Sequence, residues 1–130
     1  MTRVLYVADT HAFLYYLLDR LPPTANKAFV EAEKGNATIL VPTIALAEAI
    51  HVIEKERVNT DLKTLFSLFE LGNNFTTIDL TLEITRMIPE TRLPELHDRI
   101  ITATAKLLNA TLITKDKKIR ESQLTPTTWD

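Results

Sequence analysis

The chain contains four short segments in which apolar residues run together, separated by longer segments with helical spacing. These short segments are 3–8, 37–41, 75–78 and 111–114. Short apolar runs with few charges are typical of strands that are buried on both faces of a sheet. Because the strands alternate with helices along the whole chain, the pattern predicts an α/β fold around a central, mostly parallel sheet of about four to five strands.

Capping residues, prolines and glycines mark the expected ends of the helices. The expected helical segments are 11–18, 24–34, 44–56, 61–71, a short helix ending at 88, 94–109 and a turn at 116–120. Thr24 is expected to cap the second of these, and Asp79 or Thr81 the fifth. Gly35 and Gly72 each stand at the position that follows a helix end. Residues 125–129 are expected to add an edge strand.

Size and composition exclude several classes of protein. The 130 residues show no repeat or linker, which predicts one domain over residues 1–130. The absence of cysteine excludes disulfides, thiolate nucleophiles and cysteine-based metal sites. No secretion signal or membrane span is visible, so we expect a cytoplasmic protein. The net charge of −2 excludes nucleic-acid binding by bulk charge and confines any such function to a local site.

Acidic residues follow the predicted strands at the edge where sites form in parallel sheets. Asp9 and Asp79 directly follow two strands, and Asp116 follows the last strand after one residue. Glu48 lies in the second turn of the helix after the strand at 37–41. In an open α/β sheet, ligands bind beyond the carboxyl ends of the strands. The sequence therefore predicts that several carboxylates gather at one edge.

A comparison of lengths places Asp98 at the same edge. The helix from Asp98 to Asn109 advances about 17 Å at about 1.5 Å per residue. The segment from Ala110 to Asp116 returns about 20 Å at about 3.3 Å per residue. If the helix packs antiparallel to the strand, Asp98 and Asp116 end near each other and near Asp9.

Each acid also has an ordinary structural interpretation. Asp9, Asp79 and Asp116 are suited to capping a helix, which is the role we expect for Asp79, and Asp98 complements a helix dipole. Glu48 is harder to explain in this way because its neighbours in "TIALAEAIHVI" are nearly all apolar or small, and a buried carboxylate is costly unless paired or metal-bound. Clustered carboxylates require a cation or a proton, and oxygen ligands select Mg²⁺ or Mn²⁺.

These segments resemble a known family. "YVADTHAFLYYLL", "VPTIALAEAIHVI" and "LTLEITRMIPETRLPELHDRIITATAKLLNATLITKDKKI" are similar to PIN-domain ribonucleases, most closely the VapC-type toxins of toxin–antitoxin pairs. The last segment is the most specific, with an Asp–Arg pair, a small-residue helix and a strand closing in Thr–x–Asp. The "HDR" at 97–99 lacks the proline and aromatic residue often found before this Asp. Asn109 stands where the family often has glycine.

The resemblance implies a site, a fold, an activity and partners. It assigns Asp9, Glu48, Asp98 and Asp116 as an acidic, metal-binding quartet, with Thr10 and Thr114 as secondary candidates. It implies a three-layer α/β/α fold and Mg²⁺- or Mn²⁺-dependent cleavage of RNA. It further implies a homodimer inhibited by a cognate antitoxin.

The expected reaction is attack of a metal-activated water on a phosphodiester of RNA. Asp9 and Asp116 would be the primary metal ligands, with Asp98 shared or binding a second metal. Glu48 would hold a metal directly or through water, or orient the attacking water. Phosphate contacts are expected from four basic residues: Arg99, Lys115, Lys117 and Lys118. A salt bridge to one of the acids is the alternative for Arg99. Structural or substrate-contact roles, rather than general-base catalysis or metal ligation, are expected for three histidines: His11, His51 and His97.

Two other functions remain open at this point. A phosphorelay receiver domain also carries acids at strand ends, but it needs a phosphoacceptor after a central strand, and only Asp79 is available for that role. A catalytically silent module would use the acids to receive a basic segment of a partner. Metal binding distinguishes this silent module from a nuclease.

Overall fold

A computed structural model describes residues 4–56, 58, 60–70 and 74–130. The elements in this part of the chain, in order, are β1 (Val4–Ala8), α1 (Thr10–Leu17), α2 (Pro23–Glu33), β2 (Ala37–Pro42), α3 (Thr43–Glu56), α4 (Leu62–Glu70), β3 (Phe75–Ile78), α5 (Leu82–Thr91), α6 (Leu96–Leu107), β4 (Thr111–Ile113), α7 (Lys117–Ser122) and β5 (Thr127–Thr128). This order confirms the predicted alternation of strands and helices. The segment 125–129 does contribute the edge strand β5.

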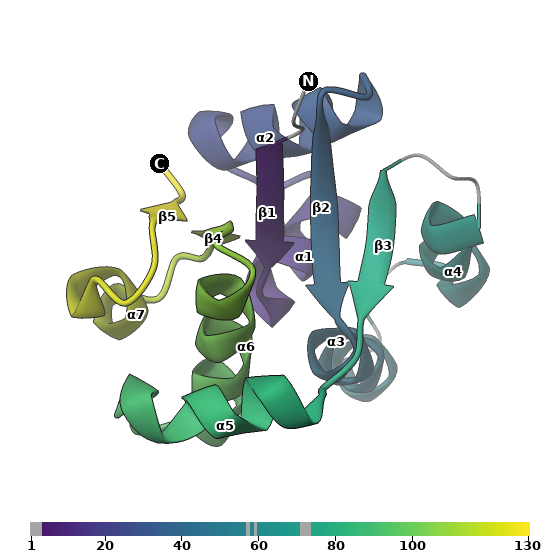
Figure 1. Ribbon diagram of the computed structural model, residues 1–130. Helices are drawn as coiled ribbons and strands as arrows, with labels where there is room; N and C mark the ends of the chain where they lie inside the picture. Colours follow the sequence, from purple (N-terminus) through teal and green to yellow (C-terminus); the bar gives the residue numbers. More distant parts are fainter. Residues whose placement is uncertain (1–3, 57, 59, 71–73) are drawn as a thin grey trace.

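The sheet has five strands in the order β3-β2-β1-β4-β5, and every neighbouring pair is parallel. Figure 1 shows α1 and α2 behind the sheet and α6 in front of it. Both α1 and α6 contact the central strand β1. The fold is therefore a three-layer α/β/α sandwich, as expected, with the carboxyl ends of β1, β2 and β4 on one edge.

The core explains why the central strands are so apolar. Val7, Ile39 and Leu112, from the three central strands, are completely buried. Full burial of such a side chain contributes about 1.5–3 kcal/mol relative to its exposure. On α6, Ala103 and Ala105 are also completely buried, which is consistent with a helix that lies close to the sheet.

The predicted cap of α2 is wrong, and of the two residues expected to cap α5, Thr81 is right and Asp79 is wrong. Helix α2 begins at Pro23, and the residue preceding it, Pro22, makes no side-chain capping bond. A proline at the first helical position has its backbone already set for a helix, so Thr24 is not needed as a cap. Asp79 is exposed and does not cap α5, because the Oγ1 of Thr81 accepts the hydrogen bond from the backbone N–H of Ile84 at 3.2 Å.

Two predicted boundaries also shift. Helix α5 continues past its expected end at residue 88 to Thr91, although Pro89 lies inside it and lacks a backbone N–H. Helix α6 begins at Leu96 rather than at Pro94.

Left-handed residues end two helices as expected. Gly35 has φ +87° after α2, and Asn109 has φ 54° after α6, which confirms that Asn109 takes the place of a glycine. Gly72 lies outside the described residues. No helix within the described ranges has both the length and the apolar character needed to cross a membrane.

Candidate active site

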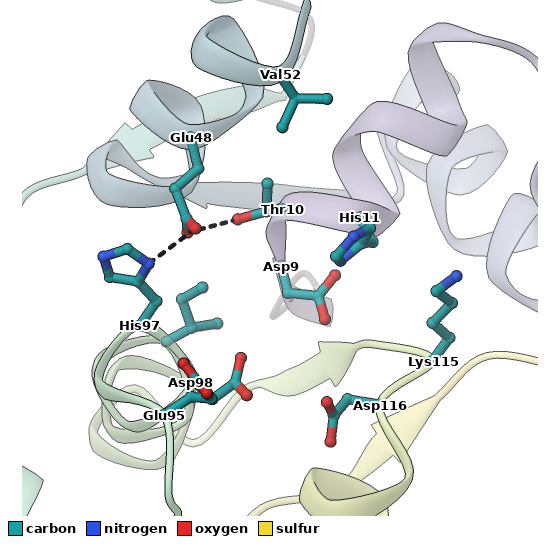
Figure 2. A pocket seen from close by; sticks show the side chains of 11 residues that line it. Asp9, Thr10, His11, Glu48, Val52, Glu95, His97, Asp98, Lys115 and Asp116 are labelled. Atoms are coloured by element: carbon teal, nitrogen blue, oxygen red, sulfur yellow. Dashed lines mark hydrogen bonds and ion pairs between the residues drawn. The ribbon is translucent and has the colours of Figure 1, made fainter. Parts of the chain in front are cut away.

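A pocket of about 410 Å³ lies beyond the carboxyl ends of the central strands. Its lining, drawn in Figure 2, consists of Asp9, Thr10, His11, Glu48, Val52, Glu95, His97, Asp98, Ile101, Lys115 and Asp116. All four acids of the expected quartet are among these residues. Asp79 is not, and it follows β3, which is an edge strand of the sheet.

Asp9 joins β1 to α1 and is 6% exposed. Its Oδ1 accepts a hydrogen bond of 2.9 Å from the backbone N–H of Ala12, which makes Asp9 the N-cap of α1. Burial raises the pKa of the Asp9 carboxyl, and the hydrogen bond from Thr114 is the strongest of the opposing effects. The ordinary capping role and a place in the pocket therefore belong to the same side chain.

Asp116 has the same double position after β4. Its Oδ1 accepts from the backbone N–H of Ile119 at 3.0 Å and caps α7. Its own backbone N–H donates to the Oγ1 of Thr114 at 3.1 Å. Thr114 is completely buried and forms hydrogen bonds with the side chain of Asp9 and the backbone N–H of Asp116, so it connects the chain segments that carry the two acids.

Asp98 lies in the first turn of α6 and is half-buried. Burial, followed by the negative charges of Asp116, Asp9, Glu95 and Glu48, raises its pKa to about 6. Helix α6 thus places Asp98 in the same pocket as Asp9 and Asp116, close enough for their charges to act on it. The agreement of helix and strand lengths predicted that placement.

Glu48 extends from α3 and has both carboxylate oxygens engaged. Oε1 accepts a hydrogen bond from the Oγ1 of Thr10 at 2.9 Å. Oε2 lies 2.8 Å from the Nδ1 of His97, on α6 (Figure 2). Glu48 thus connects α1, α3 and α6 at the mouth of the pocket. The pairing with His97 is compatible with the structural role expected for that histidine, but no pattern in the sequence indicated its partner.

Sequence reasoning missed Glu95, a fifth acid that lines the pocket. Glu95 is the residue preceding α6, and its charge is one of those that raise the pKa of Asp98. Its spacing of three residues from Asp98 places both on one face of the helix start, which was the available signal. His11 also lines the pocket, whereas His51 is exposed on α3 and does not.

The donor set fits a hard divalent cation. Carboxylate oxygens are the ligands that Mg²⁺ and Mn²⁺ prefer. Burial is the main cause of the raised pKa of Asp98, and the negative charges of the neighbouring acids, which a cation would offset, add to it. As the side chains lie, no three acidic or histidine groups in the described part of the chain are close enough to hold one ion. Ligation of one ion by three of these groups therefore requires side-chain rotation, above all of Glu48, whose two oxygens are both occupied.

The four basic candidates are placed very differently. Lys115 lines the pocket. Lys117 and Lys118 are exposed on α7, where Lys117 lies 3.8 Å from Glu121. Arg99 points elsewhere, with Nε donating to the Oγ1 of Thr91 and a terminal nitrogen donating to a backbone carbonyl of α5. Neither a pocket position nor the alternative salt bridge with an acid is found for Arg99 among the described residues.

The contacts of Arg99 explain why α5 continues past Pro89. The guanidinium and the Oγ1 of Thr91 both donate to the carbonyl of Ile88, at 3.1 and 2.8 Å, and so stabilise the last turn from outside. We expect Arg99→Gln to lower the free energy of unfolding by about 1–2 kcal/mol, measured by urea denaturation. Arg86→Gln, at an exposed position on α5, serves as the control and should change it by less than about 0.5 kcal/mol. Equal effects would contradict this role.

The family of the chain follows from comparison with known proteins. Residues 6–123 match the model of the PIN domain family. Among curated proteins, no sequence matches the chain significantly.

Similar solved structures support the same fold. VapBC2 from Rickettsia felis, bound to a DNA fragment from its promoter, is 23% identical with a TM-score of 0.73 and covers 98% of this chain and 100% of that one. DNA-bound VapBC from Salmonella typhimurium is 13% identical with a TM-score of 0.71, covering 96% and 97%. A toxin–antitoxin complex from Klebsiella pneumoniae is 22% identical with a TM-score of 0.60, covering 87% and 88%. The matched region spans most of the sequence, and the chain belongs to the PIN domain family.

Proposed function

We propose that this protein is a metal-dependent endoribonuclease and the toxin of a toxin–antitoxin pair. PIN domains are generally nucleases that use divalent metal ions. The observation that carries the proposal is the convergence of carboxylates from β1, α3, α6 and the end of β4 on one pocket, where burial and then the neighbouring negative charges raise the pKa of Asp98 to about 6. The similarity to toxin–antitoxin structures supports the biological role.

The side chains divide the chemistry between them. Asp9, Asp98 and Asp116 would bind Mg²⁺ or Mn²⁺, which supplies water activation and neutralisation of phosphate charge when bound. Thr114 connects the side chain of Asp9 to the backbone N–H of Asp116. Glu48, oriented by Thr10 and His97, either joins the ligands after rotation or orients the attacking water.

The substrate and the partners belong to the same proposal. Lys115 at the pocket, with Lys117 and Lys118 on the exposed face of α7, supplies positive charge for RNA phosphates beside the acidic centre. Arg99 has no place in this surface because its guanidinium is bound to α5. We further propose a homodimer in the cytoplasm and a cognate antitoxin that inhibits it, in line with the toxin–antitoxin complexes that share the fold.

A cleavage assay with total RNA tests the activity. The purified protein should cleave RNA in Mg²⁺ or Mn²⁺, and EDTA should lower the rate more than about a hundredfold, because metal activation of water and charge neutralisation each contribute several kcal/mol. Addition of excess metal after EDTA should restore the activity.

Two results would contradict a metal-dependent nuclease. The first is cleavage that survives EDTA, or that survives Asp9→Asn combined with Asp98→Asn. The second is an intact, folded protein that cleaves nothing and binds neither Mg²⁺ nor Mn²⁺. This second result would favour the silent binding module, in which the acids receive a basic segment of a partner.

A further inference from the structure

Lys115 is the only lysine or arginine among the residues that line the acidic pocket in the described chain. Its Nζ donates a hydrogen bond of 2.8 Å to the Oη of Tyr15, on α1. The same Nζ lies 4.8 Å from the centroid of the Tyr15 ring, within the range of a cation–π contact. An exposed lysine ordinarily samples many rotamers, but two contacts with one tyrosine restrict this one.

The ammonium group of Lys115 forms no salt bridge with the acids around it in the described part of the chain. Among the described residues, the salt bridges involve His97, Lys117 and Arg120, and none involves Lys115. Its neighbour Asp116 instead caps α7. An ammonium group that lines an acidic pocket, yet contacts a neutral phenol, remains available to an anion that enters the pocket.

The side chain of Tyr15 also contacts the C-terminal segment, through Trp129. Its ring lies 5.7 Å from the ring of Trp129, centroid to centroid, at an angle of 55°. The carbonyl of Trp129 accepts a hydrogen bond of 2.8 Å from the backbone N–H of Ala25, at the start of α2. The C-terminal segment thus fixes the tyrosine, and the tyrosine fixes the lysine. His11, one helical turn before Tyr15, lines the pocket on the side where Lys115 lies (Figure 2).

We propose that Lys115 and Tyr15 form a phosphate-binding subsite at the rim of the pocket, in which Tyr15 is a positioning residue that holds the Lys115 ammonium. The ligand is a backbone phosphate of a nucleic acid strand, adjacent to the phosphodiester that is cleaved. Lysine provides a compact point charge on a flexible stem, so its geometry depends on what holds it. The subsite rests on the proposed function for the identity of the strand.

Equilibrium binding of a short fluorescent single-stranded RNA, with Ca²⁺ in place of Mg²⁺, tests the subsite. Lys115→Gln should weaken binding about tenfold at low salt and reduce the slope of log K against log [salt] by about 0.7, the value for one phosphate contact on a single strand. Tyr15→Phe keeps the ring but removes the hydroxyl that holds the ammonium, and should weaken binding about threefold. In the Lys115→Gln background, Tyr15→Phe should have no further effect.

Two matched controls separate positioning from general damage. Tyr16→Phe removes the neighbouring hydroxyl, which donates a hydrogen bond of 2.8 Å to Glu33. Neither residue lines the pocket, so this change should leave binding unchanged. Lys117→Gln removes a nearby exposed charge that does not line the acidic pocket and should change binding less than Lys115→Gln. In cleavage assays, Tyr15→Phe should raise KM with little change in kcat.

The inference is overturned if Tyr15→Phe weakens binding by the same factor with and without Lys115, or behaves like Tyr16→Phe. It is also overturned if Lys115→Gln leaves the salt dependence unchanged. Failure of the proposed function looks different, because the wild-type protein then cleaves no RNA in Mg²⁺ or Mn²⁺. The binding cycle in Ca²⁺ is measured independently of that result.

Discussion

Replacing Asp98 with asparagine should strongly lower the rate of RNA cleavage and, at neutral pH, make the metal-free protein more stable. Asp98 lies among four other acids whose charges, after burial, raise its pKa. Asp98→Asn keeps the shape and removes the charge, so it should lower the rate about a thousandfold, equivalent to about 4 kcal/mol of transition-state stabilisation. The same change removes the electrostatic repulsion between Asp98 and the neighbouring acids in the folded protein.

The direction of the stability effect follows from proton linkage. The pKa of Asp98 is about 6 in the folded protein against 3.8 for an ordinary aspartate, so between these values the folded state binds a proton that the unfolded state has lost. Stability from this group is therefore full below about pH 4 and falls as the pH rises to about 6. The difference between the two pKa values corresponds to about 3 kcal/mol of stability. We expect a loss of about 1 kcal/mol, because solvent screens the half-exposed carboxylate.

Thermal unfolding without metal, followed from pH 4 to pH 8, measures this effect. The wild-type protein should lose stability between about pH 4 and pH 6, and Asp98→Asn should lose less. Asp79→Asn is the matched control, since Asp79 is exposed outside the pocket and should leave both cleavage and the pH profile unchanged. Equal pH profiles for the wild type and Asp98→Asn, or wild-type cleavage by Asp98→Asn, would contradict the placement of Asp98.

Asp9 allows its two roles to be separated by a pair of substitutions. Asp9→Asn retains an oxygen that can accept the hydrogen bond from the backbone N–H of Ala12, whereas Asp9→Ala removes it. Both should reduce metal-dependent cleavage about a thousandfold, because both remove a buried charge that is proposed to bind the metal. Only Asp9→Ala should lose the N-cap of α1, so its free energy of unfolding should lie about 1 kcal/mol below that of Asp9→Asn.

Urea denaturation of the metal-free variants, together with cleavage rates in Mn²⁺, checks the pair. Asp9→Asn should be at least as stable as the wild type at neutral pH, because burial raises the pKa of Asp9 and so penalises its charge. Cleavage at the wild-type rate by Asp9→Asn would show that Asp9 only caps the helix. Equal stability of Asp9→Asn and Asp9→Ala would show that it does not cap it.

The fold was predictable because its signals are local and repeated. Apolar runs such as 37–41 indicate strands buried on both faces, and their alternation with helices restricts the sheet to parallel pairing. Helix ends were less predictable, because distant contacts decide them. The last turn of α5 depends on Arg99, which comes from the next helix, and no local pattern near Pro89 contains that information.

The acids of the site were predictable for the same reason. Asp9 and Asp116 occupy strand ends, and the length comparison places Asp98 beside them. Contacts between side chains of separate elements were not predictable. The pairing of Glu48 with His97 depends on how α3 and α6 face each other, and that of Lys115 with Tyr15 joins residues 100 positions apart.

Calorimetric titration of the metal-free protein with Mn²⁺ tests the central claim most directly. The acids Asp9, Asp98 and Asp116 are proposed to hold the ion, so the wild-type protein should bind Mn²⁺, and Asp9→Asn combined with Asp98→Asn should abolish the heat of binding while the protein remains folded. Asp79→Asn should bind as the wild type does. A folded wild-type protein that takes up no Mn²⁺ or Mg²⁺, or a double variant that binds them as tightly as the wild type, would contradict a metal site in this pocket.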